Sequence, residues 1–327
     1  MSNVTYLLTL SNEFYPINKD YYYAALQYEI TMPIALLPNL YFLYFTLTEK
    51  VLKKRPSLKK NILTFTTLNI TFIITNLLVS SVYLNGYFNQ GLIRVKLCFY
   101  IRNIQLTLMT LLVTVPLVFT IDRYFTVFSN NDYQKYICFI VFLLSNFPSF
   151  TLVITTFINS NTVWVSDEIC TFSKVSTINT INSIIFSIYY ITLGIPFIVG
   201  IINFFLIRRL NTITVTSAFA KSNKNENKTV FINLIIQTLQ PFVGQLPSIL
   251  FFFYFGLTQN NIYLVWRILD GLSTLSLVLN VLFSIIFIKE VRNAVFRRLS
   301  INTINDKKNI VTITNNNMLK SKKNIIK

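Results

Sequence analysis

The residues that could do chemistry in this chain are charged side chains within or beside long apolar runs. Arg102 lies in one such run, which ends in Asp122 and Arg123. Arg267 and Asp270 lie in the last run. Ionisable side chains at these positions are costly to desolvate, so they usually bind a ligand, pair with one another or control a conformational change. The chemistry they indicate is charge pairing and recognition.

Catalytic and metal chemistry has little support in this composition. The chain has no His and three Cys, so a Cys/His zinc site and a Ser/His or Cys/His catalytic pair are not expected. Only 13% of the residues are charged, against about a quarter in a soluble domain. We therefore predict that the chain is not an enzyme and has no cofactor and no metal.

The charged side chains must be positioned by helices in lipid, because the apolar residues form long runs separated by short polar stretches. A span needs about 20 mainly apolar residues, and lipid leaves the backbone no partner except its own helix. We predict an all-α membrane protein with a seven-transmembrane helix bundle over residues 23-288. Its spans lie at about residues 23-48, 61-84, 97-122, 136-158, 181-207, 230-257 and 263-288.

Lysines and arginines set the predicted orientation, because loops on the cytosolic side of a membrane are rich in both. Six lie in residues 49-60, five in residues 208-228 and ten in residues 289-327. With Arg123 and Lys135, these segments hold 23 of the 29 basic residues. An outer N-terminus and a cytosolic C-terminus fit seven spans. The net charge of +17 is then a topology signal with some attraction to anionic membrane lipid, and no nucleic acid partner is expected.

The segments outside the spans are short. Residues 1-22 are predicted to be an extracellular N-terminus, with a glycosylation sequon at Asn3. Residues 289-299 place apolar residues on one helical face among basic ones. This pattern predicts a short amphipathic interfacial helix, or else a plain cytosolic cap on the last span. Residues 300-327 are predicted to be a basic, disordered cytosolic tail.

Asp122, Arg123 and Tyr124 end the third predicted span. The triplet and the seven oriented helices resemble the rhodopsin-like G-protein-coupled receptors, which carry Asp-Arg-Tyr at this place. Cys98 opens the same span 25 residues before Arg123, the separation usual in that family. The resemblance covers about residues 23-299 and implies the fold and function of a receptor.

The resemblance also implies particular contacts. In the family, the cysteine that opens the third helix is disulfide-bonded to the second extracellular loop, which implies a disulfide between Cys98 and Cys170. Cys138, within the fourth span, is left as a buried thiol. Asn280 stands where the family has Asn-Pro-x-x-Tyr near the end of the last span.

The resemblance gives the triplet the role of an activation switch. In the family, its arginine is held by an acidic residue at the foot of the sixth helix. Glu226 fills that place when Pro247 is taken as the proline of the sixth span. The alternative is that Arg123 only extends its charged end to the membrane interface.

Other residues usual in the family are replaced here. No acidic residue lies near Thr71 or Phe72, and Leu246, Val281, Ser284 and Phe204 stand where the family has Trp, Pro, Tyr and Tyr. Loss of these residues, with retention of the triplet, the cysteine pair and the prolines, is similar to the nematode serpentine chemoreceptors. Residues 121-126 and the entry to the sixth span suggest the gamma or v class of these receptors.

A candidate ligand pocket lies near the outer ends of the third and seventh spans. It comprises Arg102, Gln105, Met109, Arg267 and Asp270. Gln105 occupies the place where amine receptors carry an aspartate, so a biogenic amine is not expected. Arg102 and Asp270 either contact a polar ligand or pair with each other. Met109 is either pocket wall or plain packing.

The sequence therefore predicts a chemosensory receptor in the plasma membrane, in a sensory cilium by resemblance. An external small molecule or short peptide would bind within the bundle, and a cytosolic heterotrimeric G protein would be activated. The alternative is a membrane transporter or ligand-gated channel. That alternative would be expected to carry ionisable residues deep in the bundle or paired broken helices, and the predicted helix centres are almost free of charge.

Overall fold

The structure is a computed structural model of the 327-residue chain. The residues that it describes are 6–9, 14–17, 19–89, 92–128, 133–158, 161–164, 172–173, 187–188, 191–192, 194–212, 228–229, 232–233, 235–236, 238–240, 242–244, 246–258 and 262–298.

Four of the described helices are long and apolar enough to cross a membrane. They are α1 (Tyr22–Thr48), α3 (Pro56–Asn89), α4 (Val95–Phe128) and α10 (Tyr263–Phe287). Each covers a predicted span. The 34 residues of α3 exceed the predicted 61-84, because the helix continues through polar residues at both ends of the apolar run. The short helices η1 (Lys19–Tyr21) and α2 (Lys50–Lys53) flank α1.

Three further helices overlap the other predicted spans. α5 (Gln134–Ile158) covers the fourth, whereas α7 (Ile195–Thr212) and α9 (Leu246–Thr258) cover parts of the fifth and sixth. The remaining parts of those two spans are only partly described. The structure therefore supports a multi-pass helical membrane protein, and the count of seven spans stays a prediction.

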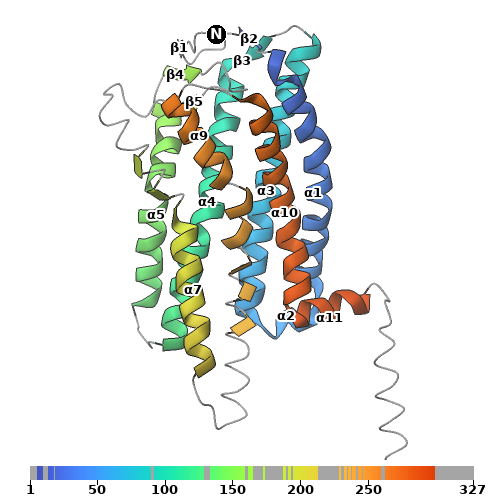
Figure 1. Cartoon of the computed structure of the whole chain (residues 1–327), viewed down its shortest axis with the longest axis vertical. Coiled ribbons are helices and arrows are strands. Elements are labelled where there is room, and N and C mark those ends of the chain that lie inside the picture. Colours follow the sequence, from blue (N-terminus) through green and yellow to red (C-terminus); the bar gives the residue numbers. More distant parts are fainter. Residues whose placement is uncertain are drawn as a thin grey trace, which may run out of the picture.

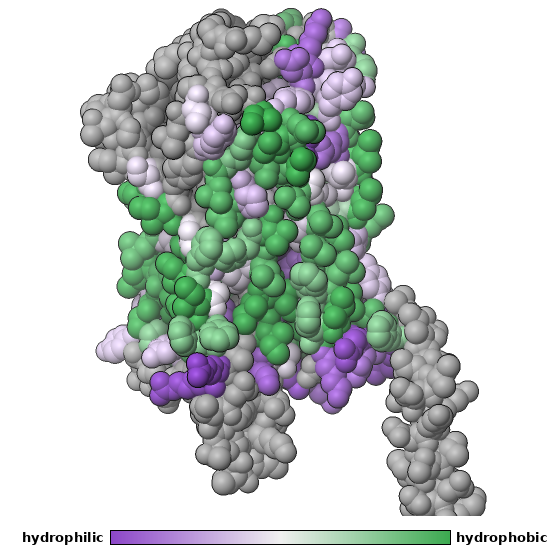
Figure 2. Space-filling view, in the orientation of Figure 1, coloured by the Kyte–Doolittle hydropathy of each residue, from purple (hydrophilic) through white to green (hydrophobic). Residues whose placement is uncertain are grey.

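The helices pack side by side as one bundle (Figure 1). α1 contacts α3 and α10, α3 contacts α4, and α4 contacts α5 and α7. Large apolar side chains such as Leu37, Leu144 and Phe205 are exposed on its outer surface. Figure 2 shows apolar residues over the middle of the bundle and hydrophilic residues toward both of its ends. An apolar surface of this kind is compatible with a lipid environment.

Short strands lie across one end of the bundle, which we call the strand-capped end (Figure 1). β1 (Tyr6–Thr9) pairs antiparallel with β4 (Asn161–Trp164), and β4 pairs with β5 (Phe172–Ser173). β2 (Phe14–Pro16) pairs with β3 (Leu92–Arg94). The N-terminal segment is thereby tied to two connections between helices, an arrangement that the sequence did not indicate.

A helix is present where the sequence predicts one after the last span, as α11 (Lys289–Arg298). It lies across the opposite end of the bundle, which we call the α11 end (Figure 1). Its buried residues Val291, Ala294 and Val295 join an apolar cluster that contains Phe45 and Leu58. The buried side chains of α11 therefore share one apolar cluster with residues of α1 and α3.

Candidate functional site

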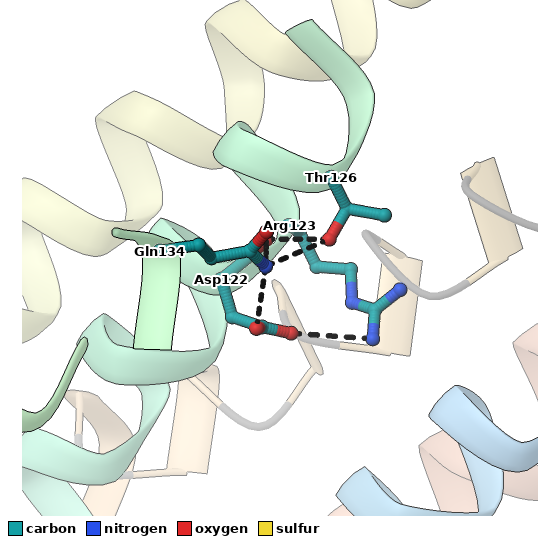
Figure 3. A network of polar contacts seen from close by, with 4 residues as sticks. All are labelled: Asp122, Arg123, Thr126 and Gln134. Carbon is teal, nitrogen blue, oxygen red and sulfur yellow. Dashed lines mark hydrogen bonds and ion pairs between the residues drawn. The ribbon is translucent and has the colours of Figure 1, made fainter. Parts of the chain in front are cut away.

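Asp122 and Arg123 lie in the last two turns of α4 (Figure 3), and α4 ends at the α11 end of the bundle (Figure 1). Nη2 of Arg123 lies 3.3 Å from Oδ2 of Asp122, and the two side chains are 11% and 33% exposed, respectively. Nε of Arg123 is buried and donates to no acceptor within the described structure. An arginine with a long ion pair and an unused donor keeps the capacity to bind a further acceptor.

Gln134, the first residue of α5, binds the same acid from the next helix (Figure 3). Its Nε2 donates to Oδ1 of Asp122 at 2.8 Å and to the backbone oxygen of Asp122 at 2.9 Å. The same nitrogen lies 3.1 Å from Oγ1 of Thr126. The two carboxylate oxygens of Asp122 are therefore divided between Gln134 and Arg123. Sequence reasoning did not find Gln134, because its register across the connection from α4 has no local signal.

The structure describes two of the other predicted members of the switch, Tyr124 and Asn280. Tyr124 is 45% exposed, and its ring contacts that of Phe125. Glu226 lies outside the described residues, so its contact with Arg123 stays a prediction. Asn280 belongs to a separate group of amides inside the bundle.

That group is a chain of four buried amide side chains. Asn280 donates to Gln240 at 2.7 Å, Gln240 donates to Asn69 at 2.8 Å, and Asn69 donates to Asn39 at 3.3 Å. Asn39 donates in turn to the backbone oxygens of Ala35 and Leu277. The chain joins α1, α3 and α10 to residue 240 without a carboxylate. The sequence does not single out Asn39, Asn69 or Gln240, because asparagine is common throughout the chain and isolated polar residues carry no pattern.

A second charged cluster lies in the half of the bundle toward the strand-capped end. The hydroxyl of Tyr28 in α1 donates to Oδ1 of Asp270 in α10 at 2.6 Å. Nη2 of Arg267 lies 2.9 Å from Oδ2 of Asp270, an ion pair that lacks the alignment of a hydrogen bond. Gln27 of α1 also donates to the backbone oxygen of Arg267. These contacts fasten α1 to α10.

Arg102 and Gln105 extend this cluster onto α4. Nη1 of Arg102 donates to Oε1 of Gln105 at 2.7 Å, and Nε2 of Gln105 donates to Oδ1 of Asn76 in α3 at 2.5 Å. Both Arg102 and Arg267 act electrostatically on Tyr28, so the two cations face one region of the bundle. Met109 packs against an apolar cluster. The structure thus brings four predicted pocket residues to one region and places Met109 in packing.

The predicted outer modifications fall mainly outside the described residues. Cys98 is fully buried in the first turn of α4, and Cys138 on α5 has a free thiol. Cys170 and Asn3 lie outside the described part of the chain. β5 begins two residues after Cys170 and contacts α4. The disulfide between Cys98 and Cys170 and the glycan at Asn3 therefore stay predictions.

Comparison with protein-family models finds no match, and comparison with curated proteins finds none either. Function must therefore be argued from the two charged clusters. Within the described residues, no group of three or more His, Cys, Asp or Glu side chains could hold a metal ion. What the clusters can do chemically is to bind acceptors and to exchange partners between helices.

Proposed function

We propose that this chain is a seven-transmembrane G-protein-coupled chemosensory receptor, similar to the nematode serpentine receptors. The observation that carries the proposal is the Asp122–Arg123 pair at the end of α4, in which a buried arginine has a long ion pair and, among the described residues, a donor without an acceptor. Such an arginine can leave its acid for another acceptor at modest cost. That property suits a switch between two states of the bundle.

The α11 end would face the cytosol, where the basic segments 49-60, 208-228 and 289-327 belong. A heterotrimeric G protein would bind there when Arg123 is released. In the resting state, Glu226 would add a second acid to Arg123. Positively charged residues at this end would also attract anionic membrane lipid.

The strand-capped end would face outward and receive the ligand. Nε and Nη1 of Arg267 are buried and donate to no acceptor within the described structure, which favours an external small molecule or short peptide with acceptor oxygens. Arg102, Gln105 and Asp270 would contact the same ligand. A disulfide between Cys98 and Cys170 would hold the outer loop over this region, and a glycan at Asn3 would lie beside it.

The chain of buried amides would transmit a movement at the strand-capped end toward the α11 end of the bundle. Asn280 lies ten residues beyond Asp270 on α10, about 15 Å along the helix axis. A ligand that moves α10 against α1 would disturb the bonds from Asn280 to Gln240 and from Asn69 to Asn39. Neutral amides inside the bundle can exchange partners without the desolvation cost of a buried, unpaired charge.

The test is basal signalling, because it requires no known ligand. Asp122→Asn should raise basal nucleotide exchange on a panel of purified heterotrimeric G proteins by roughly 10 to 150-fold, the equivalent of a charge-assisted hydrogen bond of about 1.5 to 3 kcal/mol. Arg123→Ala should abolish exchange at equal surface amount. Lys135→Gln, an exposed neighbour on α5, is the matched control. If Asp122→Asn and Arg123→Ala both signal like the parent, or if a ligand evokes a membrane current without any G protein, the chain is better explained as a transporter or channel.

A further inference from the structure

We propose that Gln134 is a positioning residue that holds Asp122 in the geometry that pairs with Arg123. The start of α5 would then set the strength of the Asp122–Arg123 pair. This inference rests on the proposed receptor function, which gives the pair its meaning, and it adds a residue from a second helix to the switch.

The need for a positioning residue follows from helix geometry. Neighbouring residues of a helix point about 100° apart, so side chains at i and i+1 do not face each other. Asp122 and Arg123 nevertheless approach to 3.3 Å. The Asp122 carboxylate must therefore turn toward Arg123 and be kept there.

Gln134 is placed to do this, because its amide nitrogen contacts Asp122 twice (Figure 3). One contact is to the main-chain oxygen at 2.9 Å and the other to Oδ1 at 2.8 Å. Contacts with both ends of one residue restrict rotation of its side chain. With Oδ1 held by Gln134, Oδ2 faces Arg123.

Water would otherwise compete for this acid, since the Asp122 side chain is 33% exposed. Gln134 is already placed on Oδ1 and on the main-chain oxygen of Asp122, whereas a water in its place would have to be immobilised. Thr126 closes the arrangement by donating to the same main-chain oxygen at 2.8 Å. The cluster is small and depends on one donor from α5.

The location of Gln134 gives the contact a regulatory consequence. It is the first residue of α5, whereas its acceptors belong to α4. A cytosolic partner that shifts the start of α5 would withdraw the amide, let Asp122 rotate and release Arg123. Through this contact, binding of the partner would weaken the Asp122–Arg123 pair.

The experiment compares Gln134→Ala and Gln134→Glu with Lys135→Gln as the matched control, each purified as full chain in lipid nanodiscs. Glu keeps the size of Gln but cannot donate when ionised, so it separates the hydrogen bond from packing. Both Gln134 variants should raise basal nucleotide exchange on the G-protein panel by about 2 to 10-fold. Both should also speed amide hydrogen exchange in residues 122–128, and the control should match the parent.

The background of Asp122→Ala distinguishes positioning from a plain structural role. There, Gln134→Ala should add less than about twofold to basal exchange, because its acid is already gone. Multiplicative effects of the two substitutions would overturn the proposal, as would a Gln134→Glu variant that behaves like the parent in both measurements.

The two proposals fail in different ways. If neither Asp122→Ala nor Arg123→Ala alters nucleotide exchange relative to the parent, the receptor function fails. Amide hydrogen exchange would still test the contact between Gln134 and Asp122 in that case, since the measurement needs no G protein. If Asp122→Ala raises nucleotide exchange but neither Gln134 variant does, the receptor function stands and the role of Gln134 is refuted.

Discussion

An arginine and an aspartate pair at both ends of the bundle, and the two pairs differ in how fully the acid is engaged. Toward the strand-capped end, Asp270 lies 2.6 Å from Tyr28 and 2.9 Å from Arg267, with a side chain 16% exposed. At the α11 end, Asp122 lies 3.3 Å from Arg123 and is 33% exposed. Both acids are held by groups from two helices, but Asp122 lies farther from its arginine than Asp270 does and is more exposed to solvent.

The same two residue types can therefore hold helices together at one place and act as a switch between two states of the bundle at another. Removing one partner of a buried pair costs about 3 to 5 kcal/mol, because the other charge is left without compensation. Losing the longer contact between Asp122 and Arg123 removes about 1.5 to 3 kcal/mol, because water reaches this acid and Arg123 can turn to another acceptor. We therefore expect substitutions at Asp270 to unfold the protein and substitutions at Asp122 to change its state.

The largest effect is expected for Asp270→Ala. It should destabilise the protein by about 3 to 5 kcal/mol, because Arg267 keeps a buried charge and Tyr28 loses its acceptor. Thermal unfolding of the purified protein in nanodiscs measures the loss, with Asp122→Ala as the matched variant at the other end. Adding Arg267→Met should recover part of it. Equal losses for Asp270→Ala and Asp122→Ala would remove the contrast between the clusters.

The second effect concerns the proposed link between the strand-capped end and α4. Cys98→Ser should cost about 2 to 4 kcal/mol by freeing the unfolded chain. The double variant with Cys170→Ser should be no worse in thermal unfolding and surface delivery. Cys138→Ser serves as the control, since that thiol is free. Additive losses, or a free Cys98 thiol in mass spectrometry, would exclude the disulfide.

The third effect lies between the two clusters, in the amide chain. Asn69→Leu should cost about 1 to 3 kcal/mol, because Gln240 loses a buried acceptor and Asn39 loses a donor. Thr71→Val, on the exposed side of α3, is the control and should cost less than 1 kcal/mol. Thermal unfolding compares them. A loss for Asn69→Leu no larger than for the control would mean that the chain of amides carries little stability.

The sequence predicts the long helices well, because about 20 apolar residues in a row have one stable form in lipid. It also singles out Asp122, Arg123, Arg267 and Asp270, since charges next to apolar runs are conspicuous. It does not indicate which charges pair. Asp270 binds Arg267 on its own helix and Tyr28 on α1, a choice made by the packing of α1 on α10.

The sequence also does not predict contacts between polar side chains of different helices. Gln134 and Gln240 are ordinary polar residues in sequence, and only helix packing reveals their partners. The strands at the strand-capped end have two to four residues each. Such short strands form through pairing rather than through a local preference, so the sequence has no periodic pattern that predicts them.

The smallest effect is expected at the α11 end, for Glu49→Gln. Glu49 lies 2.9 Å from Arg297 and 3.5 Å from Arg298, but the Arg297 side chain is 68% exposed. Both arginines can return to water when the carboxylate is neutralised, so the loss should be about 0 to 1 kcal/mol.

Apolar burial should matter more for α11 than this charge, because Val291 is fully buried against the bundle. Val291→Ala removes two methyl groups from that cluster and should cost about 2 kcal/mol. Amide hydrogen exchange in residues 289–298 measures how firmly α11 is held in each variant. If Glu49→Gln loosens α11 as much as Val291→Ala, the ion pairs rather than the apolar face hold it. The α11 end would then be fastened by charge in the same way as the Asp270 cluster.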